Sequence, residues 1–123
     1  MIKWGIIGLG NMGQKFASAI IETNNSKLIG VASKDKNKIK NFKNNFKFKT
    51  LVTYNNYDEI IKDKNINAIY IATLNNTHFD LIKKCSENNK NILCEKPFTL
   101  NYDQGREVHD YISKNNVIFF EGF

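Results

Sequence analysis

Short apolar runs alternate with longer stretches of mixed polarity along the whole chain. Such runs are typical of β-strands, and most of them are continuous rather than alternating, as expected for parallel strands covered on both faces. We expect strands at residues 4–8, 28–32, 51–52, 68–72, 92–94 and 117–120. The run at 68–72 gives the strongest strand signal, because it combines β-branched and aromatic residues.

Between these runs, apolar residues recur at the spacing of an α-helix. The first helix follows the first strand and carries an apolar stripe through residues 12–23. Residues 35–45 are rich in lysine and asparagine, with a narrow stripe of Ile39, Phe42 and Phe46, and predict a solvated outer helix. Further helices are expected at 57–62, from Thr77 onward, and at 101–114.

The length and composition agree with one globular domain. The chain has 123 residues, of which 41% are hydrophobic and 24% charged, and this excludes a disordered or collagen-like protein. Alternation of strands with helices is typical of a parallel sheet that helices cover. We therefore expect an α/β fold with a doubly wound parallel sheet over residues 1–123.

Three glycines stand where the first strand passes into the first helix. Gly8, Gly10 and Gly13 form a G-x-G-x-x-G motif, with Asn11 and Met12 at its variable positions. The first glycine allows the tight turn, the second a close approach of backbone to a pyrophosphate, and the third close packing of helix on strand. The motif predicts dinucleotide binding by a Rossmann fold of about six strands in the order 3-2-1-4-5-6, a merely tight structural turn being the alternative.

The end of the second strand should select the cofactor. An acidic residue there would bind the ribose 2′-hydroxyl of NAD. The sequence instead places Ser33 and Lys34 at the strand end, with Lys38 one helical turn later, and these groups suit a 2′-phosphate. We expect NADP as the cofactor, and NAD remains the alternative if Asp35 binds the ribose.

Two later turns are expected to border the same crevice, because both follow the carboxyl ends of strands near the first. One spans residues 73–78 and the other holds Glu95 and Lys96. Lys96 is a candidate to contact a substrate hydroxyl or carbonyl, since a lysine desolvated beside a cationic nicotinamide has a lowered pKa. A lysine that satisfies loop carbonyls is the alternative, and a packed or capping role is the alternative for His78.

Charge and cysteine content narrow the class of partner. The net charge is +6, yet Arg106 is the one arginine among 18 basic residues, whereas phosphate and base recognition favour arginine. We therefore expect no nucleic-acid partner. Cys85 and Cys94 lack metal-ligand spacing, and no apolar run is long enough for a membrane span, so we expect no metal, no membrane and a cytoplasmic location.

The order of these motifs resembles the glucose-fructose oxidoreductase and inositol dehydrogenase family, called Gfo/Idh/MocA. The resemblance rests on the glycine motif, on Ala-Thr-x-Asn-x-x-His at 72–78, and on Cys-Glu-Lys-Pro at 94–97 followed by Asn-Tyr at 101–102. It covers essentially the whole chain. One departure is Leu74, which stands where the family usually has proline.

The resemblance implies an oxidoreductase that moves a hydride to or from a hydroxyl or carbonyl carbon of a sugar, cyclitol, sugar nucleotide or related diol. Lys96 would be its catalytic residue. The expected cofactor-binding residues are Gly8, Gly10, Asn11, Met12, Gly13, Ser33, Lys34, Lys38, Thr73, Leu74, Asn75, His78, Glu95 and Lys96.

The resemblance also implies a second domain, an antiparallel sheet that supplies the substrate pocket, a catalytic histidine and the oligomer interface. That domain is absent from the 123 residues, so we expect a fragment that binds the cofactor without turnover, and a homo-oligomer for the intact protein. Two alternatives remain, a nucleotide-sensing module without catalysis and a basic nucleic-acid-binding domain.

Overall fold

A computed structural model of the chain describes residues 1–48, 50–96 and 101–122, without the side chain of Asn75. Six strands form one sheet in the order β3-β2-β1-β4-β5-β6, and every adjacent pair is parallel. The strands are β1 (Ile2–Ile7), β2 (Ser26–Ala32), β3 (Val52–Tyr54), β4 (Ala68–Ile71), β5 (Asn91–Cys94) and β6 (Phe119–Glu121). The predicted doubly wound sheet and its strand order are confirmed.

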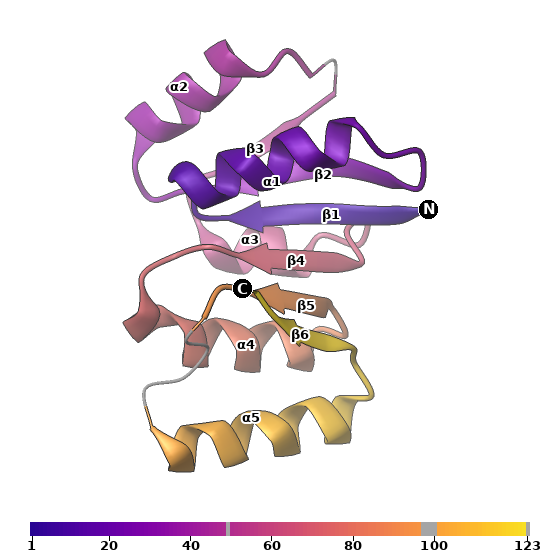
Figure 1. The fold of residues 1–123 in the computed structure, drawn as a ribbon, viewed down its shortest axis with the longest axis vertical. Coiled ribbons are helices and arrows are strands. Elements are labelled where there is room, and N and C mark those ends of the chain that lie inside the picture. The colour runs from indigo at the N-terminus through magenta and orange to yellow at the C-terminus, as the bar shows by residue number, and fades with distance from the viewer. Residues whose placement is uncertain (49, 97–100, 123) are drawn as a thin grey trace.

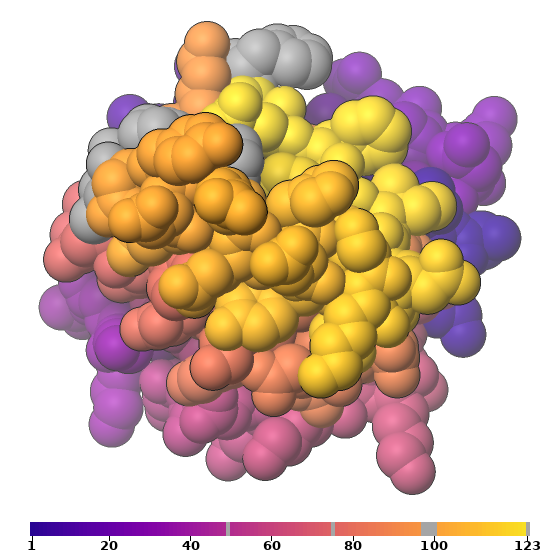
Figure 2. All heavy atoms as spheres, turned by 90° about the horizontal axis from the view of Figure 1, so that it is seen from below, coloured from indigo at the N-terminus to yellow at the C-terminus, as the bar shows by residue number. Residues whose placement is uncertain are grey.

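Helices cover both faces of this sheet (Figure 1). The helices are α1 (Asn11–Ile21), α2 (Lys36–Asn45), α3 (Tyr57–Lys62), α4 (His78–Glu87) and α5 (Tyr102–Asn115), with a 3-10 turn, η1 (Asn75–Thr77), before α4. Apolar residues of α1 and α2 pack on one face, and those of α3, α4 and α5 pack on the other. The outer surface of α5 runs beside the C-terminal strand in Figure 2.

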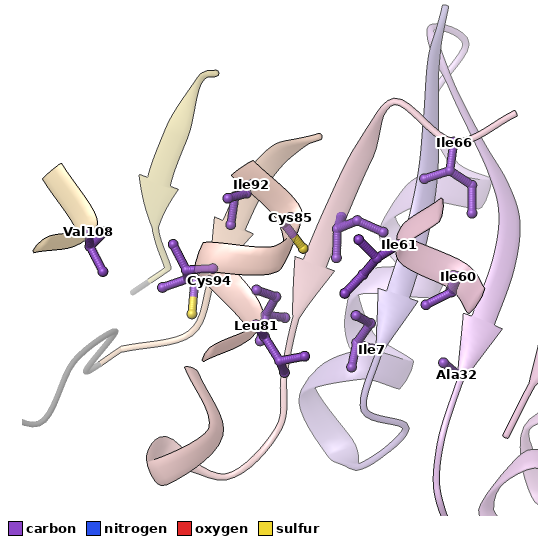
Figure 3. Packing of buried hydrophobic residues seen from close by; sticks show 13 residues of the cluster. Ile7, Ala32, Ile60, Ile61, Ile66, Leu81, Cys85, Ile92, Cys94 and Val108 are labelled. Carbon is purple, nitrogen blue, oxygen red and sulfur yellow. The ribbon is translucent and has the colours of Figure 1, made fainter. Parts of the chain in front are cut away.

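The sheet separates two hydrophobic clusters, because adjacent residues of a strand point to opposite faces. Ile6 belongs to the α1 and α2 side, and Ile7 to the α3, α4 and α5 side, where Figure 3 shows it among Ile60, Ile61 and Leu81. All four residues of β4 are buried. The continuous apolar runs therefore mark strands buried on both faces, as predicted.

Helix α2 is anchored more deeply than its polar sequence suggests. Phe42 is fully buried, and its ring lies 4.7 Å from that of Phe46 and 6.1 Å from that of Phe48. Asp35 lies outside the helix as its N-cap, where its side chain accepts the backbone N–H of Asn37 at 2.9 Å. A small aromatic cluster thus anchors this lysine-rich helix to the core.

The last strand differs from the expected range of 117–120. Helix α5 ends at Asn115, its C-cap Asn116 takes the left-handed conformation (φ 56°), and Val117 donates its backbone N–H to Ile112 O. Val117 therefore belongs to the C-terminal turn of the helix, and pairing with β5 begins later, with Phe119 opposite Ile92. A left-handed Asn cap is a local choice that apolar periodicity does not report.

We predict that Phe42→Ala destabilises the domain by about 3–5 kcal/mol, because it removes a fully buried ring and leaves a cavity. The measurement is the free energy of unfolding from urea denaturation. Lys43→Ala, at the exposed neighbouring position, serves as control and should change that value by less than about 0.5 kcal/mol. Equal losses in the two variants would contradict a buried anchor for α2.

Candidate functional site

The predicted turns meet at one edge of the sheet, because all its strands run in the same direction (Figure 1). The backbone ladder continues one residue past each of the four strands concerned. Gly8 donates to Ala32 O at 3.0 Å and Glu95 donates to Ile71 O at 3.0 Å. Likewise, Ser33 N–H bonds Tyr54 O and Ala72 N–H bonds Ile7 O. Each turn therefore leaves the sheet from a fixed level.

Strands β1 and β4 are neighbours whose helices lie on opposite faces, and the carboxyl ends of such a strand pair are where open α/β sheets bind ligands. Gly8 lies in the turn after β1 with φ +102°, a conformation that L side chains rarely adopt. A Cβ atom there would also lie 2.6 Å from Ala72 O. The turn after β1 is thus packed directly against the backbone that follows β4.

The other two glycines have different surroundings. A Cβ on Gly13 would overlap the carbonyl oxygen of Gly8, so this glycine permits the close packing of α1 on the turn. Gly10 is the N-cap of α1, with an ordinary φ of −78°, and a Cβ there would meet nothing within 4 Å. The backbone at Gly10 therefore faces open space.

The N-terminus of α1 is suited to an anion. Gly10 has no side chain to cap the helix, and the first turn contains no acidic residue. Asn11 and Met12 are exposed in that turn. The first backbone amides of a helix have no intrahelical acceptor, and the helix dipole adds positive potential at the same place.

The turn after β2 presents one buried and two exposed polar groups. Ser33 is buried, and its hydroxyl oxygen accepts the backbone N–H of Asp35 at 3.1 Å. Lys34 is exposed and its ammonium lies 5.0 Å from the ring centroid of Tyr57 on α3. Lys38 is exposed in the first turn of α2, whereas the Asp35 carboxylate caps that helix.

The turn after β4 is closed by its own hydroxyl groups. The hydroxyls of Thr73 and Thr77 lie 2.5 Å apart, and that of Thr77 also bonds Leu74 O at 2.7 Å. Leu74, which stands where the resembled family usually has proline, is 77% exposed. The side chain of Asn75, predicted to bind cofactor, lies outside the described atoms.

His78 is placed differently from the crevice-lining position that the resemblance implied. Its side chain is fully buried, and Nε2 lies 3.0 Å from Thr73 O. The imidazole therefore supports the turn from beneath, which agrees with the packed alternative. By this bond the imidazole fixes the backbone of Thr73 in the turn after β4.

The turn after β5 combines a half-buried carboxylate with an exposed ammonium. The Glu95 carboxylate accepts the hydroxyl of Tyr70 from the middle of β4, and Lys96 is exposed. Burial, this hydrogen bond and the charge of Glu95 all raise the pKa of Tyr70. Pro97, part of the predicted motif, lies outside the described residues.

Sequence reasoning missed Tyr70 as a residue connected with the site. It stands in the most apolar strand, where a phenol is expected to find a hydrogen-bond partner when it is buried. That signal marks the need for a partner but does not identify Glu95, which is 25 residues away in the sequence.

Neither cysteine nor metal chemistry is indicated by the described part of the chain. Cys85 and Cys94 are buried free thiols, and burial raises the pKa of Cys85 to about 12. Within residues 1–48, 50–96 and 101–122, His, Cys, Asp and Glu form no group of three that could hold a metal ion. None of the described helices has both the length and the apolarity needed to cross a membrane.

Relatives of known activity cover the whole domain. The chain is 34% identical to trans-1,2-dihydrobenzene-1,2-diol dehydrogenase of Xenopus tropicalis, over 98% of this chain and 37% of that protein. It is 29% identical to myo-inositol 2-dehydrogenase of Thermotoga maritima, over 99% of this chain and 36% of that protein. The chain thus spans little more than a third of the length of these relatives.

Structural and family comparisons agree with these relatives. The crystal structure of a probable dehydrogenase from Thermotoga maritima matches with a TM-score of 0.92 and 26% identity, over 98% of this chain and 36% of that one. Residues 2–123 match the family described as "Oxidoreductase family, NAD-binding Rossmann fold". The chain therefore belongs to the Gfo/Idh/MocA oxidoreductase family.

Proposed function

We propose that this chain binds a nicotinamide dinucleotide along the carboxyl edge of its sheet and serves as the cofactor domain of a dehydrogenase. The observation that carries the proposal is the open space at Gly10. Gly8 and Gly13 are required by the packing of the backbone itself, whereas no contact within the described structure requires a glycine at Gly10. A ligand that needs close access to the backbone accounts for it.

A dinucleotide pyrophosphate has the right chemistry for this position. It is a compact anion, and the N-terminus of α1 offers backbone amides, a positive dipole end and no competing carboxylate in its first turn. Asn11 and Met12 would border the pyrophosphate from that turn. The adenosine half would then extend toward the turn after β2, and the nicotinamide half toward the turns after β4 and β5.

NADP is the cofactor that the β2 turn suits best. Lys34 and Lys38 supply exposed positive charge there, and the hydroxyl of Ser33 is near enough in sequence to join them. The Asp35 carboxylate caps α2, and this explains an acidic residue here without a role in binding the ribose of NAD. A 2′-phosphate would find two ammonium groups beside this turn.

The turns after β4 and β5 would hold the nicotinamide half. Thr73, Leu74 and Asn75 would border the cofactor, and His78 would act from beneath through the Thr73 carbonyl. The bound nicotinamide supplies hydride transfer. Lys96, exposed at this edge, would hold or move the proton on the hydroxyl oxygen of a diol or cyclitol, the classes to which the substrates named in these two relatives belong, or of a sugar.

The intact protein is proposed to include a second domain that completes the substrate pocket, and to assemble as a homo-oligomer in the cytoplasm. One face of β5 and β6 supports a covering partner: Phe120 is 66% exposed and stands in register with half-buried Leu93. A hollow of 370 Å³ on this face is lined in part by Met12, Phe16 and Leu93. In these two relatives, nearly two thirds of the length lies outside the matched region.

We predict that Gly10→Ala lowers the affinity for NADPH by about tenfold or more, equivalent to about 1.4 kcal/mol, because its methyl group enters the space proposed for the pyrophosphate. The thermal midpoint should stay nearly unchanged, since φ at Gly10 is ordinary and nothing lies within 4 Å. Fluorescence titration and thermal melting measure the two quantities.

Gly13→Ala is the matched contrast, because its Cβ would overlap Gly8 O and should lower the thermal midpoint even without ligand. Unchanged NADPH affinity in Gly10→Ala, with wild-type stability, would contradict a pyrophosphate site at the start of α1. Absence of NADPH and NADH binding in the wild-type chain would contradict the proposed function as a whole.

We also predict that NADPH binds more tightly than NADH by about tenfold or more, because a hydrogen bond to a charged group contributes about 1.5–3 kcal/mol. Replacing both Lys34 and Lys38 by methionine should reduce the ratio of the two affinities toward one. Lys40→Met, at another exposed position of α2, is the control and should leave the ratio unchanged. Equal affinities in the wild-type chain, or tighter binding of NADH, would contradict a 2′-phosphate role for this turn.

A further inference from the structure

Tyr70 links the hydrophobic core to the turn that carries Lys96. It is 2% exposed, and its ring stacks on Phe16 of α1 with the centroids 4.2 Å apart and the planes inclined by 28°. Phe16 in turn meets Trp4 of β1 edge-on at 4.9 Å. The ring of Tyr70 is therefore held on the α1 side of the sheet, with its hydroxyl at Glu95.

The Glu95 side chain is confined by its neighbours as well as by this hydrogen bond. Its backbone N–H bonds Ile71 O at 3.0 Å, so the residue begins its turn from a fixed point on β4. Gly122, beyond β6, packs so closely that a Cβ there would lie 3.1 Å from Glu95 Oε1. A side chain at position 122 would therefore press on the same carboxylate oxygen that accepts the Tyr70 hydroxyl.

The polarity of the pair favours a stable donor and acceptor. Burial and the neighbouring Glu95 charge keep the phenol of Tyr70 protonated, because both disfavour a second negative charge. The hydroxyl therefore donates, and a hydrogen bond to an ionised carboxylate is stronger than one between neutral groups. If Tyr70 served only apolar packing, the ring of a phenylalanine would be enough. The hydroxyl group therefore has a role of its own at Glu95.

We propose that Tyr70 is a positioning residue for the nicotinamide half of the site, acting through Glu95. Its hydroxyl sets the direction of the Glu95 carboxylate. It thereby sets the conformation of the turn in which Lys96 directly follows Glu95. The ring, through Phe16, ties this segment to the helix whose N-terminus would receive the pyrophosphate. This inference rests on the proposed function.

The test is to remove the hydroxyl alone and to measure the two halves of the cofactor separately. In Tyr70→Phe, the affinity for NADPH should fall about fivefold to tenfold, equivalent to about 1–1.4 kcal/mol, because the Glu95 carboxylate loses the hydrogen bond that directs it. The affinity for adenosine 2′,5′-bisphosphate, which lacks the nicotinamide half, should not change. A general loss of stability would lower the affinities for both ligands alike.

Tyr54→Phe is the matched control. It removes a hydroxyl that also donates to a carboxylate, that of Asp63 at 2.5 Å, but away from the Glu95 turn. We expect it to lower stability without separating the affinities for NADPH and adenosine 2′,5′-bisphosphate. A separation as large as that in Tyr70→Phe would overturn the proposal, because the effect would then not depend on Glu95.

Glu95→Gln examines the same connection without altering the core ring, and it remains informative if Tyr70→Phe folds poorly. It should reproduce the selective loss of NADPH affinity, and adding Tyr70→Phe to it should cost little more. Fully additive losses, or equal losses for both ligands, would overturn the positioning role while leaving the proposed function intact. If the wild-type chain binds neither ligand, the proposed function fails first and this inference with it.

Discussion

The close approach of α1 to the turn after β1 is the constraint on which the site depends. Gly13 lies against the carbonyl oxygen of Gly8, and Gly8 lies against Ala72 O, so helix, turn and neighbouring strand are in backbone contact. Any side chain at these two glycines would separate the layers. The contact fixes the N-terminus of α1 beside the carboxyl ends of β1 and β4, and it leaves Gly10 facing open space, where we propose that the anion binds.

The turns at this edge of the sheet are held by hydrogen bonds from buried polar side chains. His78 holds Thr73 O, the Ser33 hydroxyl holds the amide of Asp35, and Tyr70 holds the Glu95 carboxylate. In each case a buried or nearly buried group satisfies its own hydrogen-bonding need by fixing the turn. Exposed side chains such as Lys96 thus follow directly on backbone that these bonds hold in place.

How much the sequence predicts depends on the distance over which each feature is determined. The strands, the helices and the glycine turn follow from local periodicity and spacing, and their order was correctly expected. The start of β6 was wrong because the left-handed cap at Asn116 adds a turn that apolar pattern does not encode. The partnership of Tyr70 with Glu95 was missed because it joins two strands through packing. His78 was identified by its motif, but only three-dimensional burial shows that it works from beneath.

A division of labour between local and long-range contacts follows from this arrangement. The anion site proposed at Gly10 needs only one turn and one helix, so a short motif is enough to specify it. The segment holding Lys96 needs its direction set by groups from other strands, since Glu95 is bonded to Ile71 O and to Tyr70, and Gly122 after β6 bonds the preceding residue, Cys94. These bonds come from β4 and from the chain beyond β6. The proposed nicotinamide end of the site is therefore expected to be sensitive to the integrity of the whole sheet, whereas the proposed pyrophosphate end should be sensitive mainly to the packing of α1.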